Sequence, residues 1–278
     1  MLVPGRELLA HAASRRSAVG SFNTYNLEIT RAILKAAEAR RTPVFLAVGS
    51  GALDYAGFTP LVEAVLAAAR EASVPVAVHL DHSPDVDTVA RCVAAGFTSV
   101  MIDGSELPFE KNVALTRSAI EAAHGVTVEA ELGGVAGHED RSGDQSTDIP
   151  MTDPDQAARF VDATGVASLA VAIGNAHGFY KGDPRLDFDR LAALAKRVSV
   201  PLVLHGASGI PDADLRRCVA LGVRKINVNT EIRFTLFQSL EQSLRKGVKG
   251  YDVTKLLGAA VDAMQATVEE RIAVFSQA

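Results

Sequence analysis

Three histidines follow short apolar runs of the sequence, at points where buried strands would end. His82 follows PVAVHLD, His177 follows AVAIGNA and His205 follows PLVL. Three neutral imidazoles with one open coordination position are typical of a catalytic zinc site, where the metal acts as a Lewis acid on a carbonyl group or on water. A single histidine at a strand end is more often an ordinary hydrogen-bonding residue, so the metal interpretation requires all three to meet.

Carboxylates follow other apolar runs in the same way. Asp81 directly precedes His82, and a carboxylate beside a metal is a natural general acid and base. Asp103 and Glu131 could bind a second metal position, or they could accept hydrogen bonds from the N–H groups of the histidines. His79 lies two residues before Asp81, and we expect it to be a hydrogen-bonded core histidine rather than a ligand.

Two loops contain glycine and hydroxyl residues of the kind that bind phosphate. HGASGIPD at 205–212 and NVNTE at 227–231 each lead from an apolar run into a helical segment. Gly206 allows close approach of the backbone, and a helix N-terminus offers free N–H groups to an anion. Ser208 and Thr230 add hydroxyl groups. Either loop alone is weak support, but together they predict a phosphate site.

These side chains can meet if the strands all end at one edge. Apolar runs recur at residues 18–23, 43–49, 75–82, 97–103, 126–133, 167–174, 201–206 and 223–229. Nearly all are continuous rather than alternating, as in parallel strands that are buried on both faces. Segments with helical periodicity separate them. The pattern therefore predicts an α/β fold, a (β/α)8 TIM barrel whose strand ends share one mouth.

An open, doubly wound sheet is the alternative fold. Such a sheet rarely needs eight strands, and no G-x-G-x-x-G motif opens the first helix. Residues 133–150 are Gly-rich and acidic, and they predict a lid loop after the fifth strand. Residues 229–275 predict extra C-terminal helices. We expect residues 1–278 to form a single domain.

Composition narrows the classes of partner. The 278 residues include 28 Lys and Arg against 33 Asp and Glu, a net charge of -5 without a basic cluster, which disfavours nucleic acid. Cys92 and Cys218 lie far apart, which argues against a disulfide scaffold and suits a reducing compartment. The sequence has no secretory leader pattern and no apolar run of about 18 residues. We expect a cytoplasmic protein without a membrane partner.

Six motifs carry a resemblance to a known family. HLDHS (79–83), MIDGS (101–105), EAELGG (129–134), VAIGNAHG (171–178), PLVLHGASGIP (201–211) and KINVNTE (225–231) resemble those of the class II, zinc-dependent ketose-bisphosphate aldolases. The fructose- and tagatose-bisphosphate branches are the most similar. The resemblance implies a TIM barrel that reversibly cleaves a ketose 1-phosphate or 1,6-bisphosphate to dihydroxyacetone phosphate and an aldehyde, with Zn²⁺ stabilising the enediolate. We also expect a homodimer or homotetramer.

The same motifs imply roles for individual residues. His82, His177 and His205 resemble the zinc ligands, and Asp81 resembles the group that takes the proton of the C4 hydroxyl. Glu139, in the predicted lid, resembles the glutamate that handles the proton on the dihydroxyacetone carbon. Two further carboxylates match ligands of an alternative metal position, namely Asp103 and Glu131.

The resemblance also implies a cradle for the phosphosugar substrate, with a monovalent cation, Na⁺ or K⁺, beside the phosphate. The matching residues are Gly178, Gly206, Ser208, Asn227 and Thr230. Two asparagines at the same strand ends join the predicted substrate-binding set, namely Asn23 and Asn229.

Other chemistries remain open from the residues alone. A zinc hydrolase could use the same histidines with a bound hydroxide, and a class I aldolase would need a reactive lysine, for which Lys225 is the only candidate on a strand. A phosphosugar-binding subunit without activity is a third alternative. Thr254 stands where the family has an arginine for the distal phosphate. We therefore expect poor preference for a phosphorylated aldehyde, or use of a carboxylate-bearing one such as malonate semialdehyde, released from 5-dehydro-2-deoxygluconate 6-phosphate.

Overall fold

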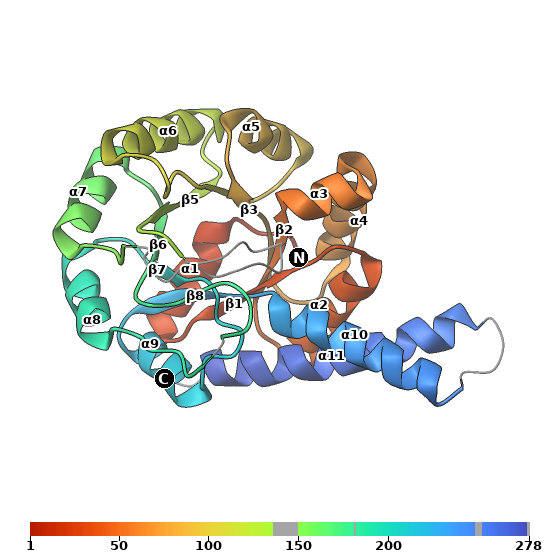
Figure 1. Ribbon diagram of the computed structural model, residues 1–278. Coiled ribbons are helices and arrows are strands. Elements are labelled where there is room, and N and C mark those ends of the chain that lie inside the picture. The colour runs from red at the N-terminus through yellow and green to blue at the C-terminus, as the bar shows by residue number, and fades with distance from the viewer. Residues whose placement is uncertain (136–149, 181, 248–251, 277–278) are drawn as a thin grey trace.

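The computed structural model describes residues 1–135, 150–180, 182–247 and 252–276. Eight parallel strands in these residues form a closed barrel in sequential order, with the last strand paired to the first (Figure 1). The strands are β1 (Val19–Asn23), β2 (Val44–Gly49), β3 (Val76–Ser83), β4 (Ser99–Ile102), β5 (Thr127–Leu132), β6 (Ser168–Val171), β7 (Leu202–Leu204) and β8 (Val223–Val228). The TIM barrel prediction is confirmed, and the open-sheet alternative is wrong.

Helices follow the strands and cover the outside of the barrel (Figure 1). Their apolar faces bury residues such as Ile33, Leu66 and Leu194, while their polar faces are exposed. The covering helices are α2 (Leu27–Arg40), α3 (Ser50–Ala56), α4 (Phe58–Glu71), α5 (Val86–Ala95), α6 (Phe109–Ala122), α7 (Pro154–Thr164), α8 (Phe188–Arg197) and α9 (Asp212–Ala220). In the part of the chain described, no single helix is long and apolar enough to cross a membrane. Helices α3 and α4 together reach that length and composition, but they are bent by 110° with respect to each other.

Helix α1 (Gly5–Arg15) closes the end of the barrel opposite the mouth, which the sequence analysis did not predict. Its Leu8 and Leu9 pack against Phe45 inside the barrel. Burying each leucine contributes about 1.5–3 kcal/mol. Because α1 closes this end, the polar side chains inside the barrel are accessible only from the mouth.

Side chains from alternate positions of the strands fill the barrel in layers, because successive residues of a strand point to opposite faces. Above the apolar floor lies a set that we call the buried layer: His79, Ser99, Glu129 and Lys225, all at most 2% exposed. Above that, toward the mouth, lies the set that we call the mouth cluster: Asp81, His82, Glu131, His177 and His205.

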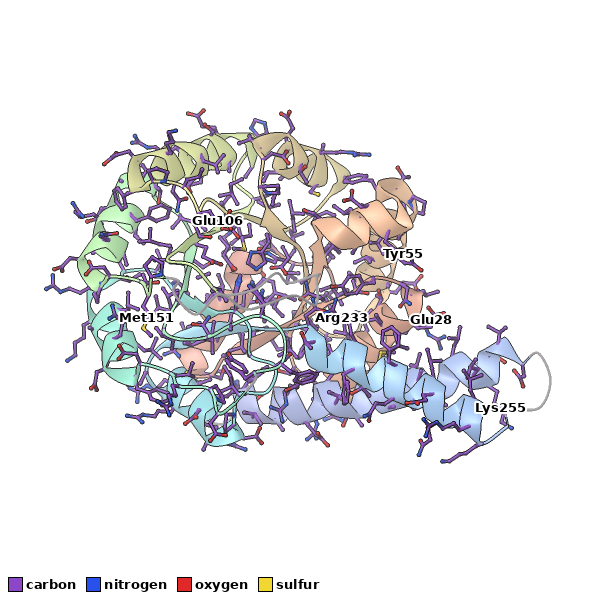
Figure 2. The ribbon with its side chains drawn as sticks, in the orientation of Figure 1. Glu28, Tyr55, Glu106, Met151, Arg233 and Lys255 are labelled. Atoms are coloured by element: carbon purple, nitrogen blue, oxygen red, sulfur yellow. The ribbon has the colours of Figure 1, made fainter. Side chains whose placement is uncertain are left out.

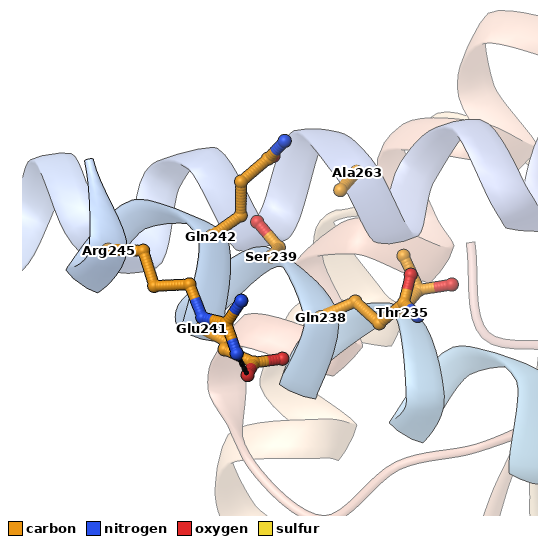
Figure 3. A pocket seen from close by; sticks show the side chains of 7 residues that line it. All are labelled: Thr235, Gln238, Ser239, Glu241, Gln242, Arg245 and Ala263. Carbon is orange, nitrogen blue, oxygen red and sulfur yellow. Dashed lines mark hydrogen bonds and ion pairs between the residues drawn. The ribbon is translucent and has the colours of Figure 1, made fainter.

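The last two helices, α10 (Thr230–Arg245) and α11 (Val253–Phe275), form an antiparallel arm that projects from the barrel (Figure 1). The hydroxyl groups of Thr235 and Thr267 lie 3.0 Å apart across the pair. The prediction of extra C-terminal helices is confirmed. A polar groove of about 390 Å³ lies on this arm (Figure 3) and contains none of the histidines; it is lined by Thr235, Gln238, Ser239, Glu241, Gln242, Arg245 and Ala263.

Candidate metal centre and active site

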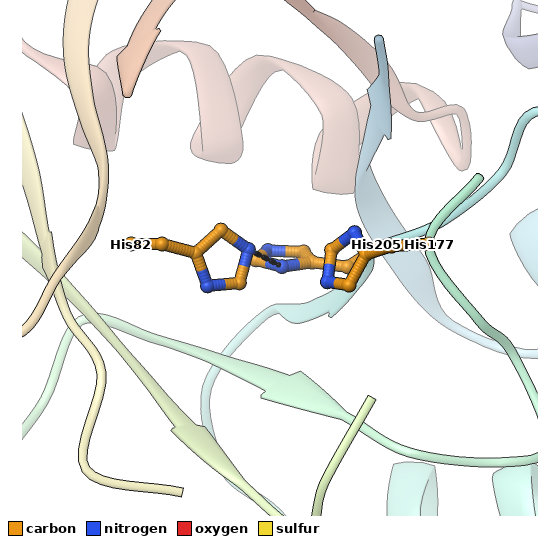
Figure 4. A group of neighbouring side chains, drawn as sticks. All are labelled: His82, His177 and His205. Carbon is orange, nitrogen blue, oxygen red and sulfur yellow. Dashed lines mark hydrogen bonds between the residues drawn. The ribbon is translucent and has the colours of Figure 1, made fainter. Parts of the chain in front are cut away.

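The three predicted histidines come together in the mouth of the barrel (Figure 4). The ring centroids of His82 and His205 lie 4.6 Å apart, those of His82 and His177 5.1 Å, and those of His177 and His205 6.1 Å. One nitrogen from each ring lies within 4.8 Å of the other two. Nδ1 of His205 is 2.9 Å from Nε2 of His82. This spacing suits three ligands of one metal ion.

A distortion of β3 brings two consecutive residues into the mouth. On a regular strand Asp81 and His82 would point to opposite faces. Here the pairing with β4 shifts register between Leu80 and Ser83, and His82 has a φ of 46°. Such left-handed backbone is uncommon for a residue other than glycine, and it clusters at functional sites. The distortion allows the carboxylate and the imidazole to share the site.

Asp103 fixes the orientation of His82. Its Oδ2 accepts a hydrogen bond from Nδ1 of His82 at 2.7 Å, and its Oδ1 accepts one from the backbone N–H of Ser105 at 3.0 Å. Burial opposes ionisation, but the hydrogen bond and charge of His82 lower the pKa of Asp103 below its usual range. Because Nδ1 donates to this carboxylate, Nε2 of His82 faces the other two histidines.

Glu131 presents an unsatisfied oxygen to the same space. Its Oε2 is buried and accepts no hydrogen bond from the described residues, and it lies 3.5 Å from Nδ1 of His205. Burial, together with the charge of Asp103, raises the pKa of Glu131 well above its usual value. His82, Asp103 and Glu131 form a second group that could hold a metal ion. Imidazole and carboxylate donors fit a divalent metal such as zinc.

Asp81 is fully buried and held by two asparagines. Nδ2 of Asn23 donates to its Oδ2 at 2.8 Å, and Nδ2 of Asn227 donates to its Oδ1 at 3.1 Å. Both asparagines were predicted to bind substrate, and that role stays a prediction. In the structure, each also orients the candidate acid and base from a different strand.

The loops after β6 and β7 are tied to each other. The hydroxyl of Tyr180 accepts from the N–H of Ala176 at 2.9 Å and donates to the carbonyl of Gly206 at 3.0 Å. Gly206 has a φ of 63°, and a Cβ there would collide with the carbonyl oxygen of Ala176. Gly178 likewise has a φ of 88°. These contacts hold His177 beside His205. Tyr180 was missed because no motif marks it.

The loops after β7 and β8, which carry the predicted phosphate cradle, are also adjacent. The hydroxyl of Ser208 accepts from the N–H of Glu231 at 3.2 Å, and Thr230 begins α10. Nδ2 of Asn229 donates to the hydroxyl of Tyr25 at 2.8 Å. The structure thus brings Ser208 to the start of α10, as the phosphate prediction requires. Glu139 lies outside the described residues.

The buried layer contains a residue that the sequence analysis missed. Glu129 stands two positions before Glu131 on β5, so both side chains enter the barrel. Oε1 of Glu129 lies 3.0 Å from Nε2 of His205, and Nζ of Lys225 lies 3.0 Å from each carboxylate oxygen. The E-x-E spacing within an apolar run could have indicated it. His79 donates or accepts at 2.8 Å with Ser99, which confirms the expected core histidine.

Thr254 lies far from this site within the chain. Its hydroxyl donates to Oδ1 of Asp252 at 2.8 Å at the start of α11. Figure 2 shows the next residue, Lys255, at the outer end of the arm, whereas Arg233 lies beside the barrel. An arginine at position 254 would therefore not reach a substrate in the mouth of the same barrel.

Comparisons with known proteins agree with this geometry. The model of the family "Fructose-bisphosphate aldolase class-II" matches residues 3–278. The chain is 43% identical to the fructose-bisphosphate aldolase of Thermus caldophilus over 300 aligned positions, covering 99% of this chain and 98% of that one. It is 44% identical to a Bacillus subtilis protein named "Probable fructose-bisphosphate aldolase", covering 96% and 95%.

A solved structure extends the likeness to three dimensions. The YdjI aldolase from Escherichia coli K12 superposes with a TM-score of 0.88 at 35% identity, covering 99% of this chain and 97% of that one. The family model, the curated relatives and this structure each match nearly the whole chain. The chain therefore belongs to the class II fructose-bisphosphate aldolase family.

Proposed function

We propose that this chain is a Zn²⁺-dependent aldolase that reversibly cleaves a ketose 1,6-bisphosphate of the fructose or tagatose type into dihydroxyacetone phosphate and an aldehyde. The observation that carries the proposal is the convergence of nitrogens from His82, His177 and His205 beside Asp81. When bound by these residues, Zn²⁺ supplies Lewis-acid polarisation of the substrate carbonyl. Family membership supports the reaction class.

The chain's own carboxylates move the protons. As the C3–C4 bond breaks, its electron pair stays on C3, next to the C2 carbonyl, and C4 becomes the aldehyde carbon. Asp81 takes the proton that the C4 hydroxyl loses, because Asn23 and Asn227 hold both of its oxygens at the mouth. We assign the proton delivered to C3 to Glu139. Condensation reverses each transfer.

A Schiff-base mechanism does not fit Lys225. Its ammonium is fully buried and lies 3.0 Å from both oxygens of Glu129, beneath the metal-binding histidines. A nucleophilic lysine must lose its proton and reach the substrate carbonyl. An ion-paired lysine inside the closed part of the barrel meets neither condition.

Arg233 is the candidate for binding the distal phosphate. It is half-buried in the first turn of α10 after Thr230, and its guanidinium lies 5.7 Å from the centre of the Tyr25 ring. No carboxylate of the described residues forms an ion pair with it. A planar guanidinium is suited to bidentate contact with phosphate. This assignment would compensate for Thr254.

The remaining expectations concern assembly and compartment. Exposed Phe234, Phe237 and Leu244 on α10 support a homodimer or homotetramer that covers the arm.

Cys92 and Cys218 are free and buried, which agrees with a cytoplasmic protein. A monovalent cation at the phosphate stays a prediction.

An aldehyde panel tests the proposed reaction. The protein is incubated with dihydroxyacetone phosphate and a series of phosphorylated, neutral and carboxylate-bearing aldehydes, and product configuration is determined by NMR. If Arg233 supplies the contact that Thr254 cannot, condensation should be fastest with glyceraldehyde 3-phosphate, in place of the poor preference expected from Thr254 alone. If no acceptor yields a ketose phosphate, and no ketose phosphate releases dihydroxyacetone phosphate, the aldolase assignment is wrong.

A further inference from the structure

A buried ion pair lies directly beneath the three histidines. Lys225 is 0% exposed and Glu129 is 2% exposed, and Nζ of the lysine lies 3.0 Å from each carboxylate oxygen. Removing two such charges from water carries a large desolvation cost, and apolar side chains of similar volume often stabilise a core as well or better. Stability alone therefore does not explain the pair.

The ion pair contacts one of the histidines through a specific ring nitrogen. Nε2 of His205 lies 3.0 Å from Oε1 of Glu129, whereas its Nδ1 lies 2.9 Å from Nε2 of His82 and 3.5 Å from Oε2 of Glu131. A carboxylate that is paired with an ammonium accepts hydrogen bonds, so Nε2 of His205 carries the proton. The lone pair on Nδ1 then faces the shared space between the histidines.

Lys225 holds Glu129 from the opposite side. An ammonium group donates three hydrogen bonds and accepts none. Nζ of Lys225 faces both carboxylate oxygens of Glu129, and Nε2 of His79 lies 3.3 Å from the same Nζ. His79 must accept there, so its Nδ1 donates to the hydroxyl of Ser99 at 2.8 Å. The buried layer is thus one connected set of hydrogen bonds, in which Lys225 donates to both His79 and Glu129 and Glu129 also accepts from His205.

We propose that Glu129 and Lys225 are positioning residues for the metal centre: Glu129 fixes the tautomer of His205 that turns Nδ1 toward the metal, and Lys225 holds Glu129 in place. This inference rests on the proposed function, because it takes His205 as a metal ligand. Carboxylate partners of ligating histidines typically change metal affinity or activity by about 10- to 100-fold when they are replaced.

Metal affinity of a conservative variant tests the proposal. In Glu129→Gln the side chain keeps its size but loses the charge, and Zn²⁺ affinity, measured by competition with a chromophoric chelator, should fall by about 10- to 100-fold. The visible absorption spectrum of the Co²⁺-loaded variant should also differ from that of wild type, because the orientation of His205 changes. Ser99→Ala is the matched control: it removes a hydrogen bond from the same layer without touching His205, and its Zn²⁺ affinity should stay within about three-fold of wild type.

Two further measurements apply if the Glu129→Gln variant does not fold because the charge of Lys225 is left unpaired. The double variant Glu129→Gln/Lys225→Met removes both charges and should fold with the same loss of Zn²⁺ affinity. In Zn²⁺-loaded wild type, ¹⁵N NMR should show His205 bound through Nδ1 with a proton on Nε2. A folded variant with wild-type affinity and Co²⁺ spectrum, or His205 bound through Nε2, would overturn the proposal. Absence of Zn²⁺ binding by the wild-type protein would instead contradict the proposed function on which this inference rests.

Discussion

The mouth cluster and the buried layer beneath it both contain a histidine from β3 and a glutamate from β5. His79 and His82 are three residues apart on β3, and Glu129 and Glu131 are two apart on β5. In the buried layer, His79 is enclosed by partners, and burial with the nearby lysine charge lowers its pKa to about 3. It is therefore neutral and satisfied.

The mouth cluster directs its ring nitrogens and one carboxylate oxygen at a common space. Nδ1 of His205 faces Nε2 of His82, and Oε2 of Glu131 is buried without a hydrogen-bond donor from the described part of the chain. The comparison teaches that the depth of a side chain in the barrel, rather than its residue type, decides whether it has a structural role or a role in the reaction. Groups one layer down orient the groups that are positioned to bind.

Replacing one histidine in each layer should give the largest contrast. His82 belongs to both possible metal groups, so His82→Ala should reduce cleavage to near background and abolish tight Zn²⁺ binding. His79→Ala should lower the free energy of unfolding by about 1–3 kcal/mol, because it leaves buried partners unsatisfied, while cleavage stays measurable. Cleavage rates and thermal unfolding check both. More than a hundredth of wild-type activity in His82→Ala would break the comparison.

Asp81→Ala should have the next largest effect on the reaction. Loss of a positioned acid and base should lower kcat for cleavage by about 10²–10⁴-fold. Zn²⁺ binding, and exchange of the C3 proton of dihydroxyacetone phosphate with solvent, should persist because other residues perform them. Proton NMR in deuterated water measures the exchange. Loss of exchange as severe as loss of cleavage would show that the division of protons between Asp81 and Glu139 is wrong.

Arg233→Ala should affect bisphosphates selectively. Removing one charge-assisted contact costs about 1.5–3 kcal/mol, or roughly 10- to 100-fold in kcat/KM for fructose 1,6-bisphosphate. The value for fructose 1-phosphate should change little. Arg245→Ala, also on α10 but paired with Glu241 in the arm, is the control and should affect neither substrate. Equal losses on both substrates would show that Arg233 does not bind the distal phosphate.

The smallest effect is a pH dependence of stability from the buried layer. With its pKa lowered to about 3, His79 stays neutral in the folded protein, while its unfolded form gains a proton below about pH 6.5. The unfolded state then binds more protons, so the free energy of unfolding falls as pH drops from 6.5. Between pH 7 and 5.5 this loss is about 1 kcal/mol. In chelator-treated protein, His79→Gln should lack that increment in denaturant titrations. An unchanged pH slope would contradict the neutral assignment.

Much of the fold could be predicted because each strand is a continuous apolar run. Residues 43–49 and 223–229, for example, differ from the observed β2 and β8 by a single terminal residue. Helix α1 was missed because its closure of the barrel is a long-range contact. Its Leu8 packs against Phe45, and no local pattern in residues 5–15 predicts this contact.

The identity of the site residues could be predicted from the sequence, but the contacts between them could not. Position at strand ends singled out His82, His177 and His205, which the structure brings together. The roles of Asn23 and Asn227 toward Asp81 depend on β1, β3 and β8 meeting in a closed barrel, and the register shift at His82 depends on pairing with β4. Such cross-strand relations are invisible in a linear sequence.

Metal removal tests the central claim most directly, because it separates a metal at the mouth cluster from a Schiff base at Lys225. Cleavage of fructose 1,6-bisphosphate is followed by coupling dihydroxyacetone phosphate to a dehydrogenase, first in chelator-treated protein and then after addition of one equivalent of Zn²⁺. We predict that activity disappears on chelation and returns with the metal. Activity that persists in metal-free protein, with borohydride trapping a substrate adduct on Lys225, would contradict the account.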